Sequence, residues 1–179
     1  MSTRLPLLTN DQVGPPELVA AIRQRRGGEL IDLDRLLLHS PAFAQGWNDF
    51  MGRVRTALQV PALLKELCMC GVAALNGADY EMLQHAPLYL KAGASQAQLD
   101  ALLRLGNDLG VAADPVFDAT QQAVLQLVVE MTRQVKVSDA TYARARAAVG
   151  SDQAMFEVIG VTAAYNMVSR ILVAAQLHP

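Results

Sequence analysis

Several features are scarce in this sequence, and each scarcity excludes a class of protein. Two cysteines among 179 residues do not make a disulfide framework. The formal net charge of −2 gives no basic surface for nucleic acid. The basic cluster Arg23, Arg25 and Arg26 is better explained by a solvated helix end than by a phosphate site. The first residues, MSTRLPLLTND, lack the apolar run of about 7 to 15 residues of a signal peptide, so we expect a cytoplasmic protein.

Runs in which apolar and polar residues alternate, as in strands, are also missing, whereas signals for helices recur along the chain. Pro61 and Gly77 bracket an apolar helix expected over 62–75, and a second helix is expected over 79–92. Further helices are expected, among them 119–136, which follows a loop at 106–118. The sequence therefore predicts an all-α fold of about seven or eight helices in one domain.

The most apolar stretch is MFEVIGVTAAYNMVSRILVAAQL, at residues 155–177. Glu157, Asn166 and Arg170 would be costly in a lipid bilayer, so we expect a buried core helix or a subunit interface and no membrane partner. Tyr165 and Asn166 place a phenol and an amide inside this apolar run. Since buried polar groups need partners, hydrogen bonds between helices are favoured over a place in the lining of a pocket.

The two cysteines lie in KELCMCGVAALNGADYEMLQH, residues 65–85. Cys68 and Cys70 are two residues apart, so on one helix their side chains point about 160° apart and cannot form a disulfide with each other. Cys68 falls on the apolar face and is expected to fill the core. Cys70 shares a side of the helix with Glu66, and a neighbouring carboxylate raises the pKa of a thiol. Cys70 is therefore not expected to act as a nucleophile unless a cation lies beside it.

The carboxylates and the histidine in this segment are better placed for chemistry. Glu81 and His85 are four residues apart, so they share a helix face one turn apart. A carboxylate there can orient the imidazole and favour its protonated form, as acid–base catalysis requires. Glu66, within an apolar helix, is the second candidate carboxylate. The pattern alone leaves open a surface ion pair or a metal site, although carboxylate-bridged metal sites in helical bundles use Glu-x-x-His twice.

The segment KELCMCGVAALNGADYEMLQHAPLYLKAGAS resembles the core of the carboxymuconolactone decarboxylase and alkylhydroperoxidase D superfamily. The stretches LLHSPAFAQGW and YNMVSRIL also resemble its longer decarboxylase-like members, and the resemblance spans about residues 5–177. It implies an alkylhydroperoxidase D-like helical bundle in which residues 1–60 form a helical segment packed on a core at 61–179. It also implies a homo-oligomer, a trimer or a hexamer.

The peroxidase branch of this family has a Glu, eleven residues, Cys-x-x-Cys, three residues and a His. Counted from Glu66, the cysteine positions fall on Ala78 and Glu81, and the histidine position falls on His85. The glutamate and the histidine are kept and both cysteines are lost. The decarboxylase branch has a Tyr-Glu pair before the histidine, which Tyr80, Glu81 and His85 match. The resemblance therefore favours the decarboxylase-like branch.

We expect a lyase without metal or cofactor that acts on a small carboxylated lactone or a related intermediate of aromatic catabolism. His85, Glu66 and Glu81 are the expected catalytic residues, and Tyr80 and Asn166 are the expected substrate contacts. Two other functions stay open at this point. One is an alkylhydroperoxidase-like antioxidant protein, and the other is a non-catalytic oligomer that binds a small molecule.

Overall fold

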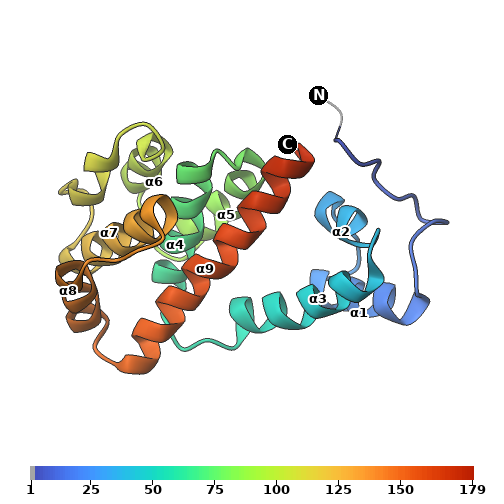
Figure 1. Ribbon diagram of the computed structural model, residues 1–179, viewed down its shortest axis with the longest axis horizontal. Helices are drawn as coiled ribbons and strands as arrows, with labels where there is room; N and C mark the ends of the chain where they lie inside the picture. Colours follow the sequence, from blue (N-terminus) through green and yellow to red (C-terminus); the bar gives the residue numbers. More distant parts are fainter. Residues whose placement is uncertain (1–2) are drawn as a thin grey trace. The chain divides into compact units, whose positions relative to one another are not determined.

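The computed structural model describes residues 3–179, and every regular element within them is a helix (Figure 1). This confirms the all-α fold, and the nine α-helices within the described residues are slightly more than the seven or eight expected. A short 3₁₀ helix, η1, lies in the expected loop at 106–118. The elements are α1 Pro16–Arg26, α2 Asp32–Leu37, α3 Pro41–Thr56, α4 Ala62–Asn76, α5 Asp79–Lys91, α6 Gln96–Arg104, η1 Leu109–Ala113, α7 Ala119–Gln134, α8 Asp139–Val149 and α9 Asp152–Ala175.

The chain divides into two compact units. The first unit comprises residues 3–58 together with 174–178, and the second comprises 59–173 together with the last residue. The expectation that residues 1–60 pack on the rest of the chain stays a prediction.

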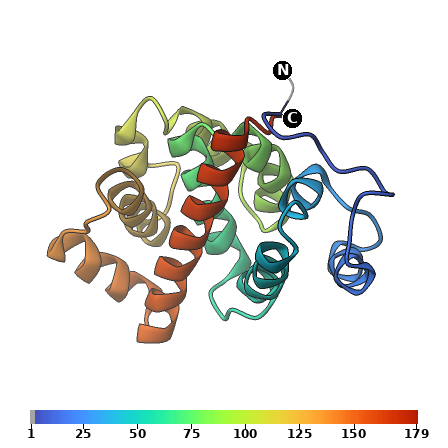
Figure 2. The same cartoon turned by 45° about the vertical axis from the view of Figure 1, so that its right-hand side comes forward.

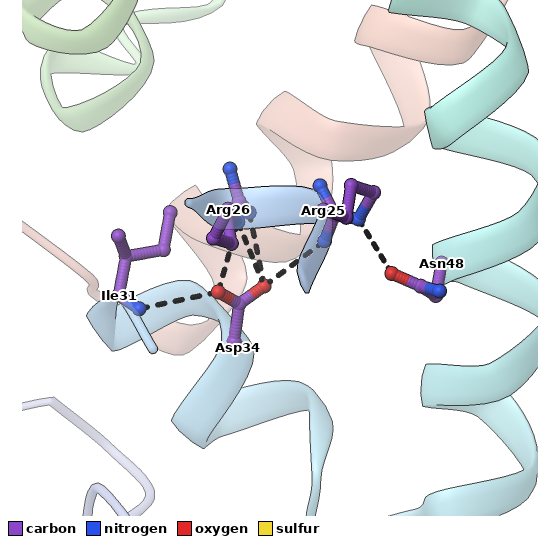
Figure 3. Close-up of polar contacts among 5 residues, drawn as sticks. All are labelled: Arg25, Arg26, Ile31, Asp34 and Asn48. Carbon is purple, nitrogen blue, oxygen red and sulfur yellow. Dashed lines mark hydrogen bonds and ion pairs between the residues drawn. The ribbon is translucent and has the colours of Figure 1, made fainter. Parts of the chain in front are cut away.

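In the first unit, a buried carboxylate joins α1 and α2 (Figure 3). Asp34, whose side chain is 1% exposed, accepts hydrogen bonds from the Arg26 guanidinium at 2.9 Å and pairs with Arg25 at 3.3 Å. Arg25 also donates to the side-chain oxygen of Asn48 on α3. The expectation of a solvated helix end was therefore wrong for Arg25 and Arg26, because a partner on α2 draws them inward.

The second unit is built around α4, which contacts α5, α6 and α7. Gly77 ends α4 in the left-handed region at φ 64°, where its backbone N–H reaches back to the last carbonyls of the helix. Because Gly77 and Ala78 alone separate α4 from α5, the two helices lie against each other. Gly71 lies at the contact with α7, where a Cβ would meet Leu125 at 3.1 Å. This arrangement fixes the α4 and α5 side chains that face each other.

Helix α9 lies against α4 in both views of the chain (Figures 1 and 2). The Asn76 side chain of α4 donates to Ser169 of α9 at 2.7 Å, and the Asn166 side chain donates to Thr132 of α7 at 3.0 Å. The expected hydrogen bonds between helices are thus confirmed for Asn166.

Within residues 3–179, α9 is also the one helix that is long and apolar enough to cross a membrane by length and composition. Half of its most apolar window is buried inside the protein. Glu157 near its start accepts hydrogen bonds at 2.8 Å from the backbone N–H groups of Gln59 and Val60. These contacts agree with the expectation that α9 is a core helix.

Candidate active site

The turn between α4 and α5 brings Glu66 and His85 together, although they are 19 residues apart in the sequence. His85 Nδ1 lies 2.7 Å from Glu66 Oε2, the distance of a strong, charge-assisted hydrogen bond. The expected glutamate and histidine therefore form a direct pair between two helices.

Glu81 approaches the other nitrogen of the same imidazole. One turn before His85 on α5, its Oε1 lies 3.1 Å from His85 Nε2. This is an ion-pair distance, but the two atoms are not aligned for a hydrogen bond, and Glu81 Oε1 is buried without another partner. The imidazole thus lies between two carboxylates, one at each nitrogen.

Tyr165 of α9 is a fourth member that the sequence did not connect with this site. Its hydroxyl lies 3.1 Å from His85 Nε2, and its ring meets the imidazole edge-on with centroids 5.0 Å apart. The Tyr165 side chain is fully buried. The phenol of Tyr165 within an apolar run predicted a hydrogen bond to another helix. The contact with His85 is such a bond, but the sequence did not indicate that His85 would be the partner.

The two carboxylates decide the charge of His85. Burial alone lowers the pKa of an imidazole, because it disfavours the charged form. The contacts with Glu66 and Glu81, and the negative charges of both, outweigh burial and raise the pKa of His85 above its ordinary value. His85 therefore holds its proton more firmly than an ordinary histidine does.

The members of the site differ in their access to solvent. The side chain of Glu66 is 15% exposed, whereas those of His85 and Glu81 are 4% and 3% exposed. A small molecule at this surface would meet Glu66 first, with the imidazole directly behind it. The arrangement can exchange a proton between a bound molecule and the buried histidine through Glu66.

The cysteines lie in the core of the same unit and are both fully buried. Burial raises the pKa of the Cys68 thiol to about 12. Burial also raises the pKa of the Cys70 thiol, and the charges of Glu66 and Glu81 raise it further. Both thiols are therefore protonated at neutral pH, which agrees with the expected core role of Cys68 and with the expectation that Cys70 is not activated as a nucleophile.

The two expected substrate contacts differ in how the structure engages them. Tyr80 is buried in the first turn of α5, and its contact with a substrate stays a prediction. The Asn166 amide donates to Thr132 and to a backbone carbonyl of its own helix, and its oxygen accepts from Asn76 and Arg170. A substrate would have to displace these partners to contact Asn166.

The arrangement of possible metal ligands bears on the alternative left open by the sequence. In the part of the chain from residue 3 onward, no group of three or more His, Cys, Asp or Glu side chains is placed to hold a metal ion. Glu66 and Glu81 instead approach opposite nitrogens of His85. The geometry is that of a hydrogen-bonded acid–base cluster.

Known proteins resemble this chain in sequence and in fold. Residues 41–109, which include Glu66, Glu81 and His85, match the carboxymuconolactone decarboxylase family. No curated protein matches the sequence. The crystal structure of an uncharacterized peroxidase-related protein from a Silicibacter species is similar at TM-score 0.74 and 19% identity, over 99% of this chain and 91% of that one.

A second crystal structure shows the same fold at lower identity. It is an uncharacterized peroxidase-related protein from Ralstonia eutropha, described as an alkylhydroperoxidase AhpD core, with TM-score 0.80 and 13% identity over 99% of this chain and 92% of that one. The helical fold and the match over residues 41–109 agree with the resemblance in the sequence. Residues 41–109 are thus similar to the carboxymuconolactone decarboxylase family, and the helical fold of the chain is that of the alkylhydroperoxidase AhpD core structure.

Proposed function

We propose that this protein is a cofactor-free lyase that removes carbon dioxide from a small carboxylated lactone or a related intermediate of aromatic catabolism. The observation that supports this proposal is a buried histidine held between two glutamates, with its pKa raised. Such a group stays protonated to a higher pH than an ordinary histidine does, and the proposed reaction needs one proton at carbon. A protonated His85 also supplies positive charge for an anionic substrate.

The reaction breaks the bond between the substrate carboxylate and the adjacent ring carbon. The electron pair of this bond passes into the unsaturated lactone, carbon dioxide leaves, and a dienolate remains. Protonation of the dienolate at carbon completes the reaction. In our proposal His85 supplies this proton and Glu66, the most exposed of the three expected catalytic residues, passes it to the substrate. Glu81 and Tyr165 hold the other nitrogen of the imidazole.

A peroxidase activity is the second candidate, because both similar structures are called peroxidase-related. Thiol-based reduction of a peroxide needs a reactive thiolate and a second cysteine to resolve the oxidised one. Ala78 and Glu81 occupy the two positions where the resemblance places cysteines, and Cys68 and Cys70 are buried thiols with raised pKa values. These observations favour the lyase.

A screen of carboxylated lactones and peroxides, followed by variants, tests the proposal. His85→Gln should lower turnover of the lactone found by roughly 100- to 10,000-fold, the usual contribution of a positioned acid or base. Glu66→Gln should cause a loss of similar size if it carries the proton, and Glu81→Gln a smaller one. Glu17→Gln, at an exposed position of α1, is the matched control.

Circular dichroism should first show that each variant is folded. Turnover near the parental rate in folded His85→Gln protein would exclude His85 as the proton source. Peroxide turnover that disappears in a Cys68→Ser, Cys70→Ser double variant would instead support the peroxidase. If neither class of compound is turned over but one binds, the protein is the non-catalytic binding oligomer that the sequence left open.

A further inference from the structure

The first unit contains a pocket of about 540 Å³ whose residues come from two short segments. The α1 residues in its wall, Pro16, Val19, Ala20 and Arg23, follow the spacing of a single helix face. Asn10 and Val13 lie opposite them in a turn, where the backbone N–H groups of Gln12 and Val13 both donate to the carbonyl of Thr9. The pocket is thus bounded by residues whose backbone is held in place.

Arg23 brings a buried donor without an acceptor to this pocket. Its Nε atom is buried and has no hydrogen-bond partner among the described residues. The carboxylate of Asp34, which lies near this end of α1, already has other hydrogen-bond partners. Its two oxygens accept from Arg25, from Arg26 and from the backbone N–H of Ile31 (Figure 3). A buried N–H donor without a partner is unfavourable, and the guanidinium of Arg23 is the charged group of this pocket wall, so Arg23 is set to receive an anion from outside the chain.

Other groups around the pocket indicate which kind of anion it would bind. The Asn10 side-chain oxygen accepts a hydrogen bond from Arg35 at 2.9 Å. The amide N–H groups of Asn10 therefore point away from Arg35 and can act as further donors. The remaining wall is apolar and is formed by the side chains of Val13, Pro16, Val19 and Ala20. Two acidic residues occur near this part of the sequence, Asp11 and Glu17. Asp11 is engaged by Thr9, and no ion pair joins Arg23 to either carboxylate within residues 3–179.

We propose that this pocket is a binding site for a small monocarboxylate with an apolar body. The carboxylate pairs with the guanidinium of Arg23, the planar group that matches it best, and Asn10 donates a further hydrogen bond. The apolar body lies against Val13 and Val19. An inorganic phosphate would find one guanidinium but would leave the apolar wall uncovered, so the site favours a carboxylate. This proposal is independent of the function of His85.

Titration with sodium benzoate, observed by NMR at the Arg Nε–Hε signals, tests the site directly. The signal of Arg23, assigned by its absence in Arg23→Gln, should shift as benzoate is added, with an affinity of roughly millimolar strength. Arg23→Gln should weaken benzoate binding by about tenfold or more, as expected for loss of a charge-assisted hydrogen bond. Ala20→Phe should also weaken it, because the larger side chain fills the pocket without changing its charge.

Arg53→Gln, which removes an exposed arginine of α3 in the same unit, should leave benzoate binding unchanged. Neutral benzamide and inorganic phosphate should each bind more weakly than benzoate. The proposal is overturned if adding benzoate does not shift the Arg23 Nε–Hε signal in the folded protein. It is also overturned if benzamide or phosphate binds as well as benzoate, or if the Arg53 and Arg23 variants lose equal affinity.

Discussion

Replacing Tyr165 by Phe should raise the pKa of His85 further, and the direction follows from the hydrogen bonds at Nε2. In neutral His85 the proton on Nδ1 is donated to Glu66, which leaves Nε2 as an acceptor. The Tyr165 hydroxyl can donate to Nε2 at 3.1 Å, whereas an ionised Glu81 cannot donate at all. In charged His85 the proton on Nε2 still has Glu81 nearby. The substitution therefore removes a partner that the neutral form needs.

The size of the effect follows from the burial of the site. A buried acceptor left without its donor costs about 1–3 kcal/mol, which favours the charged form by roughly 5- to 150-fold. The edge-on ring contact with His85 should persist, because Phe keeps the ring and opens no large cavity. We therefore expect a folded variant that is destabilised more at alkaline pH, where His85 is neutral, than at acidic pH.

The assay is a pH titration of protein labelled with ¹⁵N in its three histidines. The ring nitrogens report both the pKa and the tautomer of each histidine, and His85→Gln identifies the signals of His85. Tyr142→Phe on α8, where the side chain is well exposed, is the matched control and should change nothing. A pKa of His85 that falls, or stays where it was, in folded Tyr165→Phe protein would refute this account of the site.

Three further predictions concern stability and assembly. Burial opposes ionisation of Glu130, but hydrogen bonds from Thr141 and Ser138 lower its pKa to about 2. Its stabilising effect is present above the ordinary pKa of 4.5 and is lost as the pH falls towards 2, so Glu130→Gln should flatten the acid limb of urea-unfolding stability. Gly106→Ala should destabilise the fold because its Cβ would lie 2.5 Å from a backbone oxygen, whereas Gly46→Ala, with open space, should not; thermal unfolding compares them. Light scattering at micromolar concentration should give the mass of a trimer or hexamer, and a monomer mass would contradict this.

The helices were predictable where local signals mark their ends. Pro61 and Gly77 placed the central helix within one residue of its observed end, because a proline and a left-handed glycine act on the backbone next to them. The short helix η1 was not predicted, since five residues are too few to show a helical period. The ion pairs of Arg25 and Arg26 were missed for a different reason. Their partner, Asp34, lies on another helix, and charge in a sequence does not show which charges meet.

The same distinction applies to the site. The pairing of Glu81 with His85 follows from helix geometry alone, and that of Glu66 with His85 was carried by the family resemblance. Tyr165 is 80 residues from His85, and its direction depends on how α9 is rotated against α4 and α5. That rotation is set by packing and by contacts such as the one between Asn76 and Ser169, none of which a periodic pattern reveals.

Burial by α9 also changes what the glutamate and histidine pattern means. On an exposed helix, a Glu four residues before a His is a weak ion pair that solvent screens. Here Tyr165 covers Nε2, the side chains of Glu81 and His85 are almost fully enclosed, and only Glu66 retains moderate access to solvent. In such surroundings the charge of one residue depends on that of its neighbours. The sequence pattern can therefore nominate the three residues, but the chemistry that we propose for them depends on the helix that encloses them.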